Sequence, residues 1–197
     1  LQSLSTGAEE QLRASGVLHF EYLADPVIDA VLPAIGSTDG GTEVSIFGTH
    51  LSSLPPSTLC VFGETVAPWH AARRSSTLIA CLSPSHASGA VLVRLRDANS
   101  GVHVLGGASF TFVDVPIVGW IEPSEGCATG GGTMVTVHGT GFVSSDQASC
   151  RTEGNAISRA QWLSREVVSC FVMPSLTSST NLTLEISNDG ESFSKTV

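Results

Sequence analysis

The chain is poor in basic residues. Among its 197 residues only 9 are Lys or Arg, against 18 Asp or Glu, so the formal net charge is −9. A protein that binds a nucleic-acid backbone needs a stripe of cations to displace phosphate counterions, and the only adjacent basic pair is Arg73 and Arg74. The composition therefore excludes nucleic acid as a partner, and we interpret this pair as part of a solvated loop.

Long apolar runs, a signal peptide and an initiating methionine are also missing. No run of about 18 apolar residues occurs, so no segment is predicted to span a membrane. The chain begins at Leu1 and carries no signal peptide. We expect it to be a piece of a longer protein, so the lack of an anchor here says nothing about the parent.

The motifs of common enzymes do not occur. "GGGT" at 130–133 lacks the lysine and the helix of a phosphate-binding loop, and no G-x-S-x-G motif is present. The histidines are isolated, with no H-x-x-x-H or H-E-x-x-H pair. The sequence thus predicts no enzyme, no metal and no cofactor. The residues interpreted as surface histidines are His19, His50, His70, His86, His103 and His138.

What the sequence does contain is an internal repeat. "GGTEVSIFGTHL" at 40–51 returns as "GGTMVTVHGTGF" at 131–142, and the chain matches itself at an offset of about 90 residues. Self-similarity at a fixed spacing is the signature of tandem domains. The matched pairs include Pro26 with Pro116, Pro33 with Pro123, Gly36 with Gly126, Gly48 with Gly139, Cys60 with Cys150 and Cys81 with Cys170.

The offset also predicts where the units begin and end. Residues 1–22 overlay 91–112, so 1–24 are expected to be the C-terminal strands of a preceding repeat. Residues 25–114 form one complete repeat. Residues 115–197 form another that lacks its last strand.

Each unit shows the alternation of β-strands. In "TEVSIFG", Val44 and Ile46 alternate with polar residues, and "VLVRLRD" (91–97) and "LTLEIS" (182–187) follow the same rule. Short strands separated by turn residues predict an all-β fold, with sandwiches of about seven strands per unit. The one helix candidate, 7–14, overlays a loop between strands and is expected to form a loop or a single turn.

Four of the five cysteines recur at equivalent places. One interpretation is a disulfide in each unit, Cys60 with Cys81 and Cys150 with Cys170, each closing a loop of about 20 residues and stabilising the fold by about 3 kcal/mol. Four buried free thiols are the alternative. The spacing is too wide for zinc. Disulfides would place the chain in an oxidising compartment.

Two residues carry further expectations. Cys127 has no counterpart, because position 37 is Ser. It could pair within its unit, bond a neighbouring chain or stay free, and we favour an intermolecular bond or a partner outside this piece. Asn181 begins an N-glycosylation sequon on the outward face of a predicted strand, so we expect it to carry a glycan.

The repeated pattern resembles the IPT/TIG family of immunoglobulin-like domains. The resemblance implies tandem immunoglobulin-like (E-set) sandwiches with an intradomain disulfide in each. The second unit departs from the pattern where "CRTEG" (150–154) replaces "CVFG" (60–63). In the complete unit the pattern consists of Pro26, Pro33, Gly36, Gly40, Gly41, Thr42, Val44, Ile46, Gly48, Leu51, Cys60, Phe62, Gly63, Ile79, Cys81 and Pro84.

Units of this family occur in receptor ectodomains such as plexins, in fibrocystin-like surface proteins, in glycan-processing enzymes and in Rel-type transcription factors. The acidic charge and the cysteine pairs argue against the last group. We predict a non-enzymatic extracellular structural or adhesion module, a segment of a larger cell-surface or filament-forming protein, with a cilium or surface appendage as a candidate setting. Its partners are expected to be proteins, including neighbouring repeats or chains of the same assembly, and any membrane contact would come from segments outside this chain.

The alternative functions are an accessory carbohydrate-binding module of an extracellular enzyme and a ligand-binding receptor ectodomain. Sugar binding needs an exposed aromatic platform, and three Trp and one Tyr provide little material. Trp69 and Trp162 are interpreted as core residues near the second cysteine of each unit. Trp120 is left open between a cover for the junction of the units and ordinary core.

Asp25 and Asp114 stand at the predicted junctions. A calcium site there would need about six oxygen ligands, and few other acids lie nearby in sequence. The interpretation is therefore a structural linker. Because the linkers are short and contain proline, the units are expected to form a semi-rigid rod.

Overall fold

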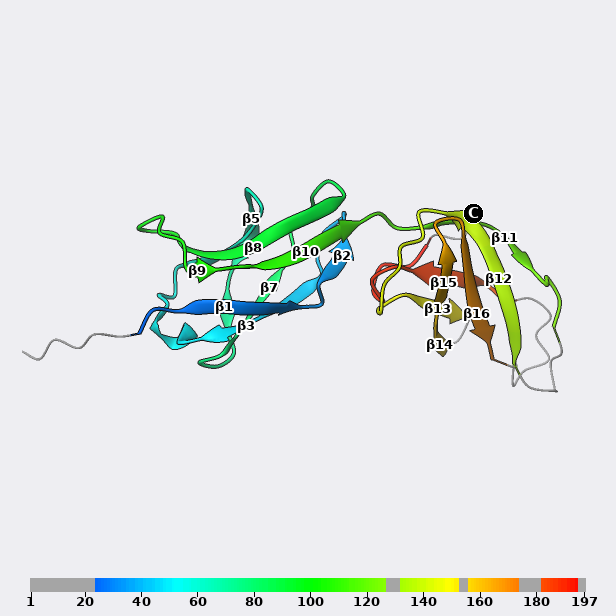
Figure 1. The fold of residues 1–197 in the computed structure, drawn as a ribbon, viewed down its shortest axis with the longest axis horizontal. Coiled ribbons are helices and arrows are strands. Elements are labelled where there is room, and N and C mark those ends of the chain that lie inside the picture. Colours follow the sequence, from blue (N-terminus) through cyan, green and yellow to red (C-terminus); the bar gives the residue numbers. More distant parts are fainter. Residues whose placement is uncertain (1–23, 127–131, 153–155, 174–181, 195–197) are drawn as a thin grey trace, which may run out of the picture.

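Two β-sandwiches follow one another along the long axis of the molecule (Figure 1). The computed structural model describes residues 24–126, 132–152, 156–173 and 182–194. Residues 1–23, with the predicted strands of a preceding repeat and the helix candidate 7–14, lie outside the described part. In that part, no helix has both the length and the apolar character needed to cross a membrane.

The first sandwich packs a sheet of order β6-β7-β3-β1-β9 against one of order β2-β10-β8-β4-β5. β1 pairs with β9, and β2 with β10, in parallel, whereas the other neighbours are antiparallel. Its elements are β1 (Val27–Leu32), β2 (Ile35–Ser37), β3 (Glu43–Thr49), the 3-10 turn η1 (Leu51–Ser53), β4 (Thr58–Phe62), β5 (Thr65–His70), β6 (Ala72–Arg73), β7 (Leu78–Leu82), β8 (Gly89–Asp97), β9 (Leu105–Gly106) and β10 (Ala108–Val113).

The second sandwich packs a sheet of order β11-β12-β16-β15 against one of order β14-β13-β17. All the pairings within its two sheets are antiparallel. Its strands are β11 (Ile117–Glu122), β12 (Thr133–Thr140), β13 (Ser149–Thr152), β14 (Ala156–Arg159), β15 (Gln161–Ser164), β16 (Val167–Val172) and β17 (Leu184–Ser187).

The all-β prediction and the sandwich class are confirmed. The first sandwich has more strands than the seven expected. The strands that the sequence did not reveal are β2, β6 and β9, which are only two or three residues long. Strands of that length are too short to show an alternation in sequence.

The core of the first sandwich follows the alternation in the sequence. Val44 and Ile46 of β3 are fully buried, as are Val93 and Leu95 of β8. Their polar neighbours face outward, as expected for a sheet with one buried face. Phe62, Phe110 and Phe112 fill the space between the two sheets.

The second core is built at equivalent places but contains fewer aromatics. Val135 and Val137 of β12 occupy the positions of the first pair, and Val168 and Ile186 pack against them. Phe142 is the only aromatic residue in this cluster, among the residues that the structure describes. The substitution of "CVFG" by "CRTEG" removes the counterpart of Phe62.

The glycines that recur in the repeat mark close approaches of the backbone. A Cβ atom built on Gly48 would lie 2.1 Å from the carbonyl oxygen of Val27, and one built on Gly139 would lie 2.1 Å from that of Ile117. Each glycine therefore allows β3 or β12 to approach the neighbouring first strand. The repeated phrase is an architectural motif.

Replacing Gly139 with Ala is expected to lower the free energy of unfolding of the second sandwich by about 1–3 kcal/mol, because the added methyl would overlap a carbonyl oxygen. Urea unfolding followed by circular dichroism measures this loss. Gly48→Ala should produce a matching loss in the first sandwich, whereas the exposed Ser52→Ala should change nothing. Unchanged midpoints for both glycine variants would contradict the close approach.

The linker is tied to both sandwiches by hydrogen bonds. The hydroxyl of Thr38, in the first sandwich, donates to Oδ1 of Asp114 at 3.0 Å. Nδ2 of the buried Asn188, in the second, donates to the backbone oxygen of Asp114 at 3.0 Å, and its Oδ1 accepts from the backbone N–H of Val143 at 3.0 Å. Asp114 thus links the two units by accepting a hydrogen bond from each.

Candidate functional site

The paired cysteines lie in the two cores. Cys60 on β4 and Cys81 on β7 form a disulfide with Cα atoms 6.4 Å apart, and Cys150 on β13 and Cys170 on β16 form another with 6.1 Å. Each bond joins the two sheets of its sandwich. Cys127 and the sequon residue Asn181 lie outside the described residues.

The interpretation of Trp69 and Trp162 as core residues is wrong. The side chain of Trp69 is 68 % exposed and that of Trp162 is 39 % exposed. Both stand on the edge strands β5 and β15, whose pairing with the neighbouring strand contains a register shift. At Trp69 such a shift breaks the simple alternation. Trp162 lies opposite the buried Val168 and is exposed because β15 is the edge strand of its sheet. Trp162 keeps one contact, donating from Nε1 to the backbone oxygen of Phe142 at 3.3 Å.

Trp120 is not a core residue either, since it is 55 % exposed on the outer face of β11. Its indole stacks on the imidazole of His138, the residue opposite it on β12, with ring centroids 3.6 Å apart and an interplanar angle of 5°. A register shift between Val118 and Trp120 brings the two side chains into this pairing. His138 covers one side of the indole ring.

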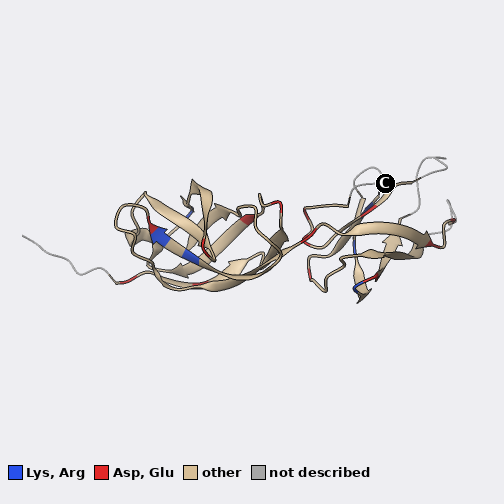
Figure 2. Ribbon diagram, turned by 90° about the horizontal axis from the view of Figure 1, so that it is seen from above, with Lys and Arg blue, Asp and Glu red and all other residues tan. Residues whose placement is uncertain are grey.

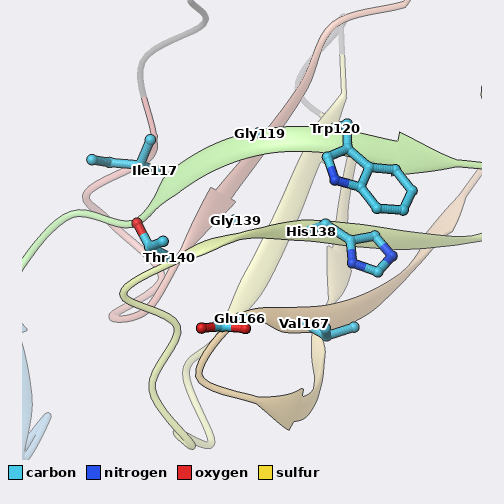
Figure 3. A pocket seen from close by; sticks show the side chains of 8 residues that line it. All are labelled: Ile117, Gly119, Trp120, His138, Gly139, Thr140, Glu166 and Val167. Carbon is cyan, nitrogen blue, oxygen red and sulfur yellow. The ribbon is translucent and has the colours of Figure 1, made fainter.

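The stacked pair forms one wall of a shallow depression of about 320 Å³ (Figure 3). Gly119 and Gly139 line it without side chains. Figure 3 shows the rings of Trp120 and His138 standing side by side on neighbouring strands, with Ile117 away from them along β11. The remaining lining residues are Thr140, Glu166 and Val167.

Glu166 supplies the only carboxylate of this lining. Its backbone N–H donates to the hydroxyl of Ser164 at 3.2 Å, and its backbone oxygen accepts from Gly139 at 2.9 Å. Its side chain is exposed and takes part in none of the ion pairs found among the described residues. The depression therefore offers an aromatic wall and a free negative charge.

The molecule as a whole also carries an excess of negative charge. Figure 2 shows acidic segments along both sandwiches and few basic ones. The three ion pairs of the described part use Arg74, Arg151 and Arg159. The negative charge in excess of these pairs creates a field that attracts cationic partners.

Two carboxyl groups away from the depression have shifted pKa values. Hydrogen bonds from the hydroxyls of Ser57 and Ser100 hold the pKa of Asp97 well below its usual range. The stabilisation from Asp97 is therefore present above its unfolded-state pKa and is lost as the pH falls. Burial raises the pKa of Glu191, with smaller contributions from Asp189 and Glu43. The ionised form of Glu191 is disfavoured in the fold, so this group opposes stability as the pH rises.

The structure brings none of the other candidate residues into a reactive cluster. Within the described ranges no group of three or more His, Cys, Asp or Glu side chains could hold a metal ion. Asp114, considered for calcium, accepts a hydrogen bond from Thr38. His86 stacks on Phe112 with centroids 4.7 Å apart, so it packs beside the core.

The pairing of Trp120 with His138 could not be found by sequence reasoning alone. The repeat gives only an indirect indication. Trp120 and His138 occupy the positions of Ala30 and Phe47, which also lie opposite each other on two neighbouring strands. At these two positions the outer faces of the two units therefore differ.

Comparison with known proteins agrees with this architecture. The chain is 26 % identical to Plexin-B3 of Rattus norvegicus over 157 residues, covering 77 % of this chain and 8 % of that protein. It is 38 % identical to Protein SPT23 of Saccharomyces cerevisiae over 72 residues, covering 36 % of this chain and 6 % of that protein. The chain thus spans less than a tenth of the length of these relatives.

The fold is similar to that of the full extracellular region of plexin A4, with a TM-score of 0.51 and 23 % sequence identity, covering 78 % of this chain and 13 % of that structure. The family model described as the IPT/TIG domain matches residues 26–112 and again 116–197. Since these two matches span most of the sequence and coincide with the two sandwiches, the chain belongs to the IPT/TIG domain family.

Proposed function

We propose that this chain is a non-enzymatic structural and adhesion module outside the cell, a segment of a longer surface or filament-forming protein that acts through contacts with other proteins. The observation that carries the proposal is the outer face of the sheet β11-β12-β16-β15, where large apolar side chains are exposed. Contiguous exposed apolar surface marks interaction sites in soluble proteins. The large apolar residues exposed on this side are Ile117, Trp120, Met134, Leu163 and Phe171.

Two further observations support the proposed location outside the cell. The disulfides persist in oxidising compartments and are rare in the cytosol. The relatives include Plexin-B3, and the similar structure is an extracellular region.

A cilium or a surface filament remains the candidate assembly, and antibody labelling of intact, unpermeabilised cells checks it. A mobility shift after enzymatic deglycosylation, lost in Asn181→Gln, checks the proposed glycan.

The unit boundaries at 1–24, 25–114 and 115–197 are part of the proposal. In the first sandwich β8 pairs with both β4 and β10. Its counterpart β17 pairs with β13, and the other β-bridge of β17 among the described residues joins Ser187 to Phe193. This supports the assignment of residues 115–197 as a unit without its last strand.

Fluorescent, bead-coupled chain should bind cells of the source organism, and brief protease treatment of the cells should abolish binding, because the partner is a protein. Phe171→Ser should reduce binding severalfold, while Leu82→Ser, at an exposed position of the first sandwich, should not. Absence of binding, or binding that survives protease, would contradict the proposal.

A carbohydrate-binding accessory module is the second candidate function. It is favoured by one observation: all three tryptophans are at least 39 % exposed. In the same bead assay, loss of binding after glycosidase treatment but not after protease would select this alternative. Detection of catalytic residues elsewhere in the parent chain would strengthen it.

A further inference from the structure

Two arginines follow each other on the outer face of the first sandwich. In β8 the side chains of Val93 and Leu95 are fully buried, so Arg94 and Arg96, which alternate with them, face away from the core. Both arginines are half-buried. Their Cα atoms lie about 7 Å apart along one strand, so the two guanidinium groups can reach the same ligand.

The strands around these arginines offer them no free acid. Asp97, the last residue of β8, is the only Asp or Glu in the five strands of its sheet, all of which the structure describes. Its carboxylate accepts hydrogen bonds from the hydroxyls of Ser57 and Ser100, both at 2.7 Å. The outer face of β8 is therefore locally positive, although the chain as a whole is acidic.

The second sandwich neutralises an arginine at the corresponding place. Directly after the disulfide cysteine of β13, Arg151 stands opposite Glu185, and their side chains form an ion pair at 2.6 Å. Directly after the disulfide cysteine of β4, the residue opposite Arg94 is Val61, which is buried and carries no charge. The fold itself thus does not balance the charge of Arg94.

Neither guanidinium group has a partner within the described part of the chain. The ion pairs and side-chain hydrogen bonds that arginines make there involve other residues. Nε of Arg96 is buried without an acceptor, so this side chain lies against the sheet. A side chain that is already partly ordered loses less entropy when a ligand binds it.

We propose that Arg94 and Arg96 bind carboxylate groups in an acidic segment of a protein partner. Guanidinium groups recognise carboxylates through parallel N–H···O hydrogen bonds. Leu92 precedes the two arginines on the same face of β8 and is 39 % exposed, so it offers apolar contact to a neighbouring side chain of the segment. The inference rests on the proposed function, because it gives the chemistry of one protein contact.

The charge of the chain limits what can occupy this face. Repulsion from the net charge of −9 grows with the negative charge of the occupant. It therefore opposes a long polyanion and a second copy of the chain more than a short segment with two carboxylates. Complementary charge close to the two arginines then decides which segment fits.

The test is a titration of the whole 197-residue chain with the peptide acetyl-Leu-Ser-Glu-Ser-Glu-Ser-amide, followed by nitrogen–proton correlation NMR. In an extended peptide the leucine and both glutamates point to one side, with the spacing of Leu92, Arg94 and Arg96. The amides of the two arginines and of His103, which lies opposite Arg96, should shift saturably at millimolar peptide. Added salt should weaken binding.

Matched variants separate local contacts from overall charge. Arg94→Gln and Arg96→Gln should each weaken binding about two- to fivefold, as for a partly exposed ion pair. Arg165→Gln, at an exposed residue of the second sandwich, changes the net charge equally and should leave the affinity unchanged. Arg94→Lys keeps the charge but loses the parallel hydrogen bonds, so it should retain part of the affinity. An unchanged circular dichroism spectrum shows that each variant is folded.

Several results would overturn the inference. These are the absence of saturable shifts at Arg94 and Arg96, an equal response to the peptide with Gln in place of both Glu, an equal loss in Arg165→Gln, a stronger response to a heparin tetrasaccharide, or shifts that appear on concentrating the chain alone. Protease-sensitive cell binding without a peptide response would leave the proposed function standing and remove only this inference. A peptide response that depends on Arg94, without any cell binding, would do the reverse.

Discussion

Replacing Phe62 with Ala is expected to lower the free energy of unfolding of the first sandwich by about 3–5 kcal/mol, because the truncation leaves a cavity in a closely packed core. Phe62 is fully buried and meets Phe110 and Phe112 edge-on, with ring centroids 5.3 and 6.0 Å away. These contacts join β4 to β10, strands that lie on either side of β8. Urea unfolding with circular dichroism measures the loss.

The matched control is Phe47→Ala, the same change at a side chain on the outer face of β3 that is 36 % exposed. This variant should lower the free energy of unfolding much less, because the solvent fills the space that the ring leaves. Phe62→Leu should recover most of the loss, since it restores apolar volume. Equal losses for Phe62→Ala and Phe47→Ala would contradict the assignment of this aromatic core.

Replacing both Cys150 and Cys170 with Ala should cost the second sandwich about 2–5 kcal/mol. The bond closes a loop with a sequence separation of 20 and joins the two sheets. We expect removal of this disulfide to destabilise its sandwich more than removal of the bond between Cys60 and Cys81 does. The described second core has one phenylalanine where the first has three. Stepwise reduction should therefore unfold the second sandwich first.

Peptide mapping without reductant is the accompanying measurement on secreted chain. It should link Cys60 to Cys81 and Cys150 to Cys170. Four free thiols would contradict the proposed extracellular setting. Unfolding of both sandwiches together on reduction would contradict the expectation that the smaller core makes the second sandwich more dependent on its disulfide.

Much of the architecture could be read from the sequence, because it depends on local rules that act twice. The alternation through Val44 and Ile46 predicts a strand with one buried face, and its return at Val135 and Val137 predicts a second sandwich. Gly48 and Gly139 recur because a side chain at either place would overlap the first strand of the unit. Such constraints belong to the fold, so every unit must repeat them.

The interaction surface could not be read in the same way. Which side chain lies opposite Trp120 depends on how β11 and β12 are aligned, and the register shift after Val118 moves the indole beside His138. Trp69 and Trp162 are also exposed, against the expectation of buried cores, because β5 and β15 are edge strands and the pairing of β5 contains a register shift. A shift of one residue exchanges the faces of a strand, and its position is decided by pairing between strands.

By itself the sequence thus determined the repeated all-β units, their family and the strands that build their cores. The tertiary structure alone decided that Trp120, His138 and Glu166 come together on the outside of the second unit. These three residues lie on β11, on β12 and in the turn before β16, so only the packing of that sheet brings them to one depression. Local alternation is set by the chain, whereas contacts between strands arise only when the sheet forms.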